Sequence, residues 1–565
     1  MNVYAPAKGG PAWHLFVPKL YTVLRQGYDA AGFRRDLLAG LTVAIVALPL
    51  AMALAIASGT TPDKGLVTAV VAGFLISALG GSRFQIGGPT GAFVVVVYGV
   101  IAKHGYDGLV VATAMAGVLL VIAGFARLGT WIKYIPLPVV TGFTSGIAVI
   151  IASSQVADLL GLSIDKVPAE FIEKWAAYAS HLGTANYAAL AVATGALATI
   201  LGLRALAPKL PGFLIAVGGA SLAVWALGLD VQTIGSRFGD LPSTLPAPQV
   251  PAVDLATLRA LIPSAFTIAF LAGVESLLCA VVADGMTGRR HRSNCELVAQ
   301  GVANLGSAMF GGLPATGAIA RTATNIRAGA VSPVAGMLHA VFLLLFMLLL
   351  APLVRYIPLA SLAAVLVVVA WNMAEIEQFT HLMSAPPGDR LVLLITFVLT
   401  VLVDLTVAIE VGVVLAAVLF MHRMAEAVQQ QTHERLIVED EDDFAPGAAR
   451  SYDRRRDLPP GVESFEMRGP FFFGVANLLG DILDRIGRPP KLFVLVLREV
   501  PVIDATGIGA LRSFADRCRR DGTQLVLVGL QPAVQASLER MGVIPRDGIA
   551  LADSLDSAVA RLAPR

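Results

Sequence analysis

The chain has 565 residues, of which 56% are hydrophobic and 15% charged, and its mean hydropathy is +0.73. A soluble protein of this length does not need so large an apolar share, so the composition indicates a polytopic membrane protein. The formal net charge of +2 points to no nucleic-acid partner, and the three cysteines lack the spacing of a metal site or a disulfide framework, so no metal or cofactor is expected.

The N-terminal segment, residues 1–36, contains no signal-peptide core and ends in a basic stretch with Arg25, Arg34 and Arg35. A basic stretch before the first membrane span favours a cytoplasmic N-terminus. We expect this segment to precede a transport domain over residues 37–427.

Apolar runs near the length of about 20 residues that spans a bilayer recur through this domain. An even number of segments returns the C-terminus to the cytoplasm, and the loops expected inside carry ten basic residues against seven outside. Two of the fourteen candidate segments, the third and the tenth, are too short to cross alone. The segments are 37–58, 65–81, 89–101, 109–127, 135–157, 184–203, 210–229, 262–284, 295–312, 317–330, 333–355, 357–374, 389–406 and 407–427.

Two short patterns recur at nearly the same separation. GGPTGA (87–92) leads into the first short segment, and GGLPATGA (311–318) leads into the second. KYIPL (133–137) is likewise echoed by RYIPL (355–359). Because each unit would contain seven segments, an odd number, the second copy must be inverted in the membrane. Interrupted helices at matching positions of inverted repeats are typical of transporter binding sites.

The C-terminal part differs in composition. Residues 428–460 are polar, mixed in charge and end in proline, which indicates a linker. From 461 to 565 apolar strand-like runs such as KLFVLVL (491–497) and QLVLV (524–528) alternate with helical patterns, so we expect a small soluble α/β domain. The helical patterns fall at 475–486, 507–520 and 531–541.

Six motifs in order carry a family resemblance. They are LPLAMALA (48–55), GPTGAF (88–93), IPLPVVTGFTSG (135–146), ELVAQGVAN (296–304), FGGLPATGAIARTATN (310–325) and VIDATG (502–507). With these, the chain resembles the sulfate permease (solute carrier 26) anion transporters with a C-terminal STAS domain, and most closely bacterial members such as a proton-linked dicarboxylate permease. The resemblance implies fourteen segments in two inverted seven-segment halves, about 37–229 and 262–427. It also implies a core domain that moves against a gate domain, and a homodimer in the inner (cytoplasmic) membrane.

The candidate anion site lies where the two short segments meet. Their N-termini are expected to face each other near the midplane, where free backbone N–H groups and positive dipole ends suit an anion. The resemblance places the anion there, beside the first span. Leu50 and Leu54 stand where the family often has glutamine and an aromatic residue, so this site is expected to be more apolar. The matching substrate-binding residues are Leu50, Leu54, Thr90, Gly91, Ala318, Ala320 and Arg321.

Two ionisable residues at membrane depth are costly unless they face a protein interior that uses them. We expect Arg321 to attract the anion; the alternatives are that it reaches a surface or pairs with an acid of the gate domain. Glu275 is expected to carry the coupling proton; the alternative is a structural carboxylate bonded to backbone N–H groups. The sodium-coupled bicarbonate branch resembles this stretch but has threonines at the positions of Cys279 and Ile319, so proton coupling or anion exchange is favoured over sodium.

Other polar or helix-breaking residues in the spans are interpreted as structural. Glu296, Gln300 and Asn304 recur every four residues on one helix face and are expected to hold helices together by hydrogen bonds. Pro49 predicts a break in the first span beside the site, with a simple kink as the alternative.

In the STAS-like domain, Asp504-Ala505-Thr506-Gly507 matches a turn that carries a phosphorylated hydroxyl residue in anti-sigma-factor antagonists. Thr506 is the matching regulatory candidate, and helix capping by Asp504 or Thr506 is the alternative. A STAS-binding regulatory protein is therefore a possible partner.

The preferred function is proton-coupled transport of a small anion by alternating access, with sulfate as the family default and dicarboxylate or bicarbonate as contenders. The expected partners are the anion, protons, membrane lipid and a second copy of the chain. No nucleophile–histidine–acid set and no Walker loop is found in the sequence, so an enzyme is not expected. The alternatives are a membrane scaffold or sensor that acts through the STAS domain, and a nucleobase permease of the same architecture.

Overall fold

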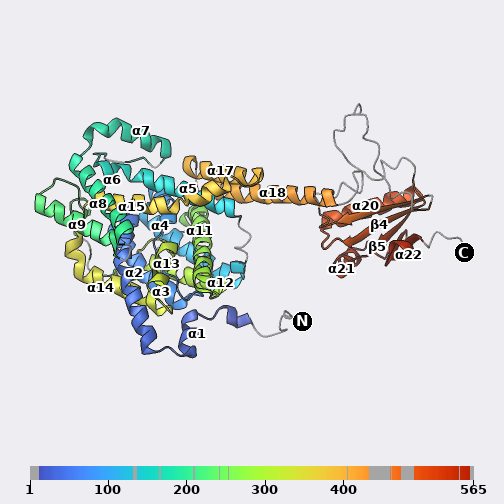
Figure 1. Cartoon of the computed structure of the whole chain (residues 1–565), viewed down its shortest axis with the longest axis horizontal. Helices are drawn as coiled ribbons and strands as arrows, with labels where there is room; N and C mark the ends of the chain where they lie inside the picture. Colours follow the sequence, from blue (N-terminus) through green and yellow to red (C-terminus); the bar gives the residue numbers. More distant parts are fainter. Residues whose placement is uncertain are drawn as a thin grey trace. The chain divides into compact units, whose positions relative to one another are not determined.

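The computed structural model separates into two compact units, Met1–Val414 and Leu415–Arg565 (Figure 1). Three predicted segments lie outside the described residues: the linker except for its ends, residues 133–135 of one repeated motif, and the helical pattern at 475–486. The described residues are 12–130, 136–164, 167–168, 170–207, 210–240, 242, 244–251, 254–403, 405–431, 458–459, 461–472, 489–545 and 548–559.

The first unit is helical. Among its described residues and the adjoining part of α18, nine helices are long and apolar enough to cross a membrane. Its main helices are α1 (Lys19–Gln26), α2 (Ala30–Ala57), α3 (Pro62–Leu79), α4 (Val94–Phe125), α5 (Leu137–Ser154), α6 (Val156–Leu160), α7 (Phe171–His181), α8 (Tyr187–Leu206), α9 (Gly212–Leu227), α10 (Ile234–Phe238), α11 (Leu255–Thr287), α12 (Ser293–Met309), α13 (Ile319–Arg327), α14 (Val334–Val354), α15 (Leu359–Met373), α16 (Ile376–Leu382) and α17 (Pro387–Leu402), and α18 (Leu405–Gln431) leads into the second unit.

The helix boundaries follow the predicted segments with two instructive differences. The third and fourth predicted segments form one run, α4, whose two helices meet at Gly105, a residue with φ of 71° that is not helical. The predicted break at Pro49 was wrong, because α2 continues through this proline as one helix. A membrane helix tolerates proline where neighbouring helices and local adjustments satisfy the backbone group that it frees.

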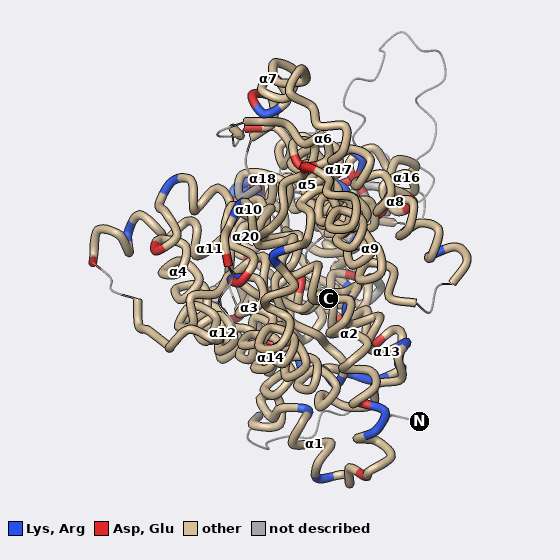
Figure 2. The backbone as a smooth tube through the Cα atoms, turned by 90° about the vertical axis from the view of Figure 1, so that its left-hand side faces the viewer, with Lys and Arg blue, Asp and Glu red and all other residues tan. Residues whose placement is uncertain are grey.

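Packing divides the helices of this unit into two groups. The core group comprises α2, α3, α4, α11, α12, α13 and α14, and the gate group comprises α5, α6, α7, α8, α9, α15, α16 and α17. Contacts between the groups run mainly through α2 against α9 and α15, and through the short 3-10 helix η2 (Gly91–Phe93) and α4 against α5. Helices α1 and α7 lie at opposite ends of the unit in both views (Figures 1 and 2). Both of these helices carry charged residues, and long stretches of the helices between them are uncharged (Figure 2).

Buried hydrogen bonds tie α12 to the core group, as the four-residue polar spacing predicted. Glu296 is fully buried and accepts hydrogen bonds from the Gly81 backbone N–H at 2.8 Å and the Gln300 side chain at 3.0 Å. Asn304 exchanges two bonds of 2.9 Å with the backbone of Ala315. These bonds hold the loop before the first repeat motif, and the second repeat motif itself, against one helix.

The second unit contains a four-stranded parallel sheet in the order β3 (Val462–Arg468), β4 (Leu492–Glu499), β5 (Gln524–Val528) and β6 (Ile549–Ala552). Apolar clusters lie on both faces, one with α20 (Ala505–Arg520) and α21 (Pro532–Arg540), the other with α22 (Leu555–Val559). Parallel strands need covered faces, which explains why the strand sequences read as continuous apolar runs.

Candidate anion site

The site is built on a two-stranded pair that joins the repeat motifs. Strand β1 (Gly87–Gly88) pairs antiparallel with β2 (Thr316–Gly317), with Gly87 opposite Gly317. Because the strands run antiparallel, the chain leaves them in opposite directions, and each copy enters its helix within three residues. The sequence repeat therefore becomes a local two-fold arrangement in the middle of the core group.

Both helices begin without a side-chain cap. Thr90 precedes η2 and Ala318 precedes α13, each in an extended conformation with no capping hydrogen bond from its side chain. The first N–H groups of a helix have no partner within the helix and carry its positive dipole end. Two uncapped N-termini beside one strand pair are an arrangement that suits an anion.

Arg321 lies in the first turn of α13 and is only 2% exposed. Its Nη2 donates to the carbonyl oxygen of Pro89, which belongs to the other repeat. Gly88 allows this approach, because a Cβ atom there would lie 2.7 Å from Arg321 Nη1. Its Nε and Nη1 have no hydrogen-bond partner among the described residues. Arg321 therefore neither reaches a surface nor pairs with a gate-group acid. It reaches from α13 to the start of the first short segment, which consists of η2 and the first part of α4. We call this segment the first half-helix and α13 the second half-helix.

Glu275 of α11 is hydrogen-bonded to the start of the first half-helix, where the Thr90 hydroxyl donates to Glu275 Oε2 at 3.0 Å. The carboxylate also interacts electrostatically with Arg321. One turn further along α11, the Cys279 thiol donates to Thr322 Oγ1 at 3.2 Å, and the same oxygen accepts from a backbone N–H at 3.0 Å. Thr90, Glu275 and Arg321 thus form one polar cluster between the repeats.

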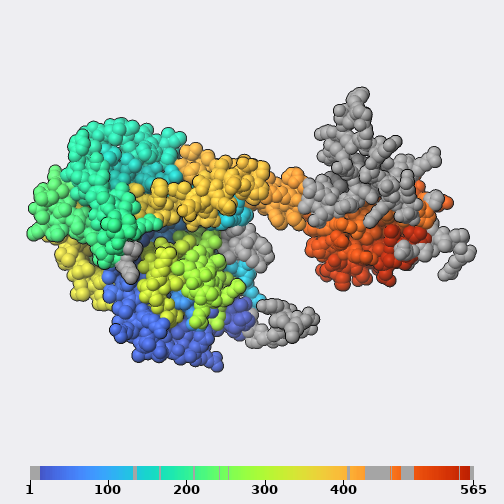
Figure 3. Space-filling model, in the orientation of Figure 1, coloured from blue at the N-terminus to red at the C-terminus, as the bar shows by residue number. Residues whose placement is uncertain are grey.

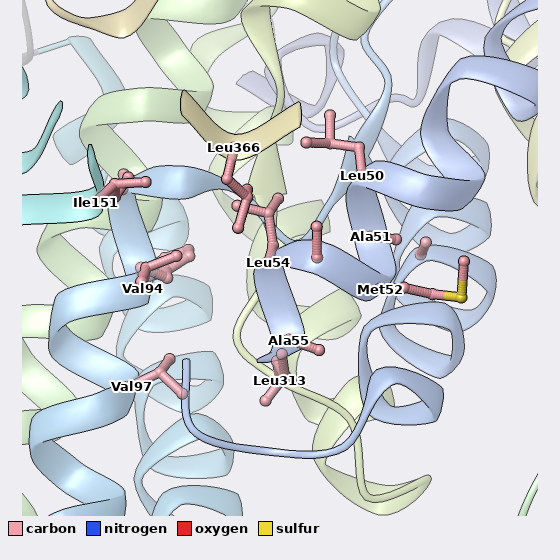
Figure 4. Packing of buried hydrophobic residues seen from close by; sticks show 14 of the residues in the cluster. Leu50, Ala51, Met52, Leu54, Ala55, Val94, Val97, Ile151, Leu313 and Leu366 are labelled. Carbon is pink, nitrogen blue, oxygen red and sulfur yellow. The ribbon is translucent and has the colours of Figure 1, made fainter. Parts of the chain in front are cut away.

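Three other predicted residues, Leu50, Leu54 and Gly91, lie in apolar surroundings near the contact between the helix groups. Leu50 and Leu54 of α2 are 8% and 2% exposed, and Leu366 of α15 lies beside Leu54 (Figure 4). Gly91 abuts the gate group closely, because a Cβ atom there would lie 2.5 Å from Met373 Sδ. The first half-helix therefore begins at the contact surface between core and gate.

Two predicted residues of the second half-helix differ in burial. Ala318 is 7% exposed, and Ala320, two residues further along, is exposed. Thr506 lies in the second unit, where it is exposed in the first turn of α20. Asp504 caps that helix by accepting from the Gly507 N–H at 2.7 Å, which agrees with the capping interpretation of the motif.

His339 was missed by the sequence analysis. It lies on α14, is fully buried, and neither ring nitrogen has a hydrogen-bond partner among the described residues. A Cβ atom on Gly73 would lie 3.1 Å from the Gly87 carbonyl oxygen and 4.0 Å from His339 Cε1, so the imidazole lies behind the strand pair. A lone histidine in the apolar run LHAVFLLLF was the available signal.

Comparison with known proteins agrees with this architecture. Residues 33–396 match the Sulfate permease family and residues 457–558 match the STAS domain. The fold is similar to that of murine Solute Carrier 26 family member A9, with a TM-score of 0.83 at 18% identity over 99% of this chain and 96% of that one. It is also similar to the transmembrane domain of a cyanobacterial bicarbonate transporter, BicA, with a TM-score of 0.61 at 28% identity over 69% of this chain and 98% of that one.

Two curated relatives cover almost the whole chain. "Putative sulfate transporter YvdB" of Bacillus subtilis (strain 168) is 41% identical over 528 residues, 93% of this chain and 96% of that one. "Bicarbonate transporter BicA" of a Picosynechococcus strain is 31% identical over 527 residues, 91% of each chain.

The fold is that of a multi-pass membrane protein with a C-terminal STAS domain. The chain belongs to the sulfate permease family of anion transporters, and it is not an enzyme. The relative at 41% identity carries the name "Putative sulfate transporter", which corrects the expected near resemblance to a dicarboxylate permease.

Proposed function

We propose that this protein is a secondary transporter that moves a small oxyanion by alternating access, with sulfate as the first candidate and bicarbonate as the second. The observation that carries the proposal is the pair of uncapped helix N-termini beside β1 and β2, with the Arg321 guanidinium buried between them. Backbone N–H groups and one guanidinium supply both donors and positive charge for an oxyanion.

The choice of substrate rests on the names of two relatives, "Putative sulfate transporter" and "Bicarbonate transporter". The apolar side chains of Leu50 and Leu54 add no hydrogen-bonding group to the site. Selectivity among oxyanions then depends on the backbone N–H groups, on Arg321 and on the room left between the two helix groups.

Glu275 is proposed as the proton-coupling residue. It accepts a hydrogen bond from Thr90 at the entry of the first half-helix, so its charge is sensed where the anion binds. Protonation of Glu275 would remove a negative charge next to an arriving anion and thereby favour symport. Sodium coupling is disfavoured, because the Cys279 thiol and the Ile319 side chain offer no hard oxygen ligand.

The wider organisation is part of the same proposal. A transport domain over residues 37–427 would lie in the cytoplasmic membrane as a homodimer, and a STAS domain over 461–565 would lie in the cytoplasm with the N-terminus. Exposed Thr506 at a helix N-terminus would be the contact or modification point for a regulatory protein.

Uptake into proteoliposomes tests the proposal. Labelled sulfate, bicarbonate and succinate are offered with and without an inward proton gradient, and sulfate or bicarbonate uptake stimulated by the gradient is expected. Absence of uptake for all three anions would overturn the proposed function, and uptake of succinate alone would restore a dicarboxylate substrate.

Glu275→Gln tests the coupling separately. This variant is expected to keep anion uptake and to lose its stimulation by the proton gradient, because the amide mimics the protonated carboxyl. Glu410→Gln, which alters an exposed carboxylate, serves as the matched control. A Glu275→Gln protein that responds to the gradient like the unaltered protein would remove Glu275 from the coupling role.

A further inference from the structure

Helix α7 (Phe171–His181) lies at the end of the transport unit opposite α1, and the chain from α6 to α9 forms a continuous part of the surface there (Figures 1 and 3). Its two buried residues are Lys174 and Tyr178, which are 6% and 2% exposed. Because they are four residues apart, they lie on the same face of the helix. A helix outside the membrane spans thus presents a cation and a hydroxyl group inward.

Among the described residues, Lys174 has no acidic partner. Its Nζ lies 5.9 Å from the ring centroid of Tyr98, and it makes no ion pair among the described residues. Burial lowers the pKa of the Lys174 ammonium, because its charged form has lost water without gaining a counter-ion. A buried cation of this kind is stabilised by an anion that enters beside it.

The Tyr178 hydroxyl is a second buried polar group whose bonding capacity is unused among the described residues. It is buried and has no hydrogen-bond partner among the described residues. The nearby carboxylate of Asp158 is already neutralised by Arg237 at 3.0 Å, so it does not compensate Lys174. One charged donor and one neutral donor are therefore buried on the same face of α7, and such a pair suits an oxyanion.

Tyr98 connects the buried face of α7 to the helix that begins at the candidate anion site. Tyr98 is part of the first half of α4, seven residues after Gly91, a distance of about 10 Å along a helix. Its hydroxyl donates to the carbonyl oxygen of Val167 at 3.0 Å, so the tyrosine joins the core group to the segment before α7. An anion held by α7 would therefore lie about two turns along this helix from the candidate anion site.

Lys64 provides a contrast within the same chain. It also lies over a tyrosine of α4, 5.3 Å from the ring centroid of Tyr106. However, Lys64 is more exposed and has Asp63 at 3.8 Å, so its charge is already balanced. The unbalanced charge is thus particular to Lys174 and not a general feature of lysines near α4.

We propose that Lys174 and Tyr178 form a second anion-binding station, for the same oxyanion class that the protein transports, at the α7 end of the path to the half-helices. The station rests on the proposed function and concentrates the substrate where Tyr98 closes the core against α7. Lys174 supplies the charge, and Tyr178 supplies the hydrogen bond.

Binding is tested on the full chain with Trp175 as the sole tryptophan, because the Trp175 and Tyr178 ring centroids are 5.9 Å apart. Sulfate titration at constant ionic strength, with gluconate as the balancing anion, is expected to change Trp175 fluorescence. The response is expected to disappear in Lys174→Gln and to persist in Lys174→Arg, Lys64→Gln and Arg321→Ala. A response that survives Lys174→Gln, or no response in the parent protein, overturns the station.

Uptake kinetics provide the second measurement. Lys174→Gln is expected to raise the KM for sulfate about tenfold, the scale of one lost charged hydrogen bond, and Tyr178→Phe about threefold. Lys64→Gln is expected to leave KM unchanged. Because the Trp175 response does not require transport, absence of uptake by the unaltered protein together with an intact response would count against the proposed function alone. Equal KM values for Lys174→Gln and Lys64→Gln would overturn the station.

Discussion

The two half-helices share a backbone arrangement and differ in their side chains. In the first, Thr90 and Gly91 provide a hydroxyl group for Glu275 and a close contact with the gate group. In the second, Arg321 provides a buried guanidinium that reaches across to Pro89. The repeated motif therefore accounts for two uncapped helix N-termini, whereas the side chains place a hydroxyl group and a gate contact at one of them and a guanidinium at the other.

The largest effect on transport is expected for a substitution in the second half-helix. Arg321→Ala should raise the KM for the transported anion about 10- to 100-fold, since a hydrogen bond to a charged group contributes about 1.5–3 kcal/mol. Uptake kinetics in proteoliposomes measure this change. Arg327→Ala, at the exposed end of the same helix, is the control and should change little. An unchanged KM for Arg321→Ala would make the two halves equivalent and restrict the arginine to structure.

Strand packing gives the next effect. A Cβ atom on Gly317 would lie 1.9 Å from Gln85 Nε2, and that amide is held at 2.6 Å from Ser276 Oγ. Gly317→Ala should therefore destabilise the transport unit by about 1–3 kcal/mol, the usual cost of overpacking, seen as a lower thermal unfolding temperature in detergent. Gly99→Ala, where nothing lies within 4 Å, is the control. Equal unfolding temperatures would contradict a rigid second half.

Gly91→Ala should act on motion rather than stability. The new methyl group meets Met373 Sδ, a flexible side chain of the gate group, so the fold can adjust while the contact between the groups becomes harder to form. We expect turnover to fall about fivefold, or about 1 kcal/mol, with little change in KM or unfolding temperature. A fall in unfolding temperature as large as that of Gly317→Ala would show that both glycines have the same role.

Thr90→Val should have the smallest effect. It removes the hydrogen bond to Glu275 and keeps the side-chain shape, a loss of about 0.5–1.5 kcal/mol. We expect the pH dependence of uptake to shift while maximal turnover is kept. Thr324→Val on α13, whose hydroxyl bonds only its own helix, is the control. Identical pH profiles for the two variants would show that the Thr90 hydroxyl does not affect the proposed coupling residue, Glu275.

Much of the fold follows from local pattern. The span predicted at 184–203 is α8 (Tyr187–Leu206), and the one at 333–355 is α14 (Val334–Val354). Apolar run length determines these helices because the bilayer requires it. Glycine and proline at the repeat motifs also marked where the helices are interrupted. Pro49 misled the sequence analysis, because helix continuity there depends on neighbouring helices that the local pattern does not contain.

The sequence by itself determined the membrane class, the repeated motifs and the identity of Glu275 and Arg321 as the costly residues at depth. The tertiary structure decided which groups they meet. Three features depend on residues that are distant in the chain. They are the hydrogen bond from Arg321 to Pro89, the burial of His339 behind the strand pair, and the position of Lys174 over the Tyr98 ring. Periodicity describes one helix at a time, whereas a partner is set by how helices pack, so these contacts required the folded molecule.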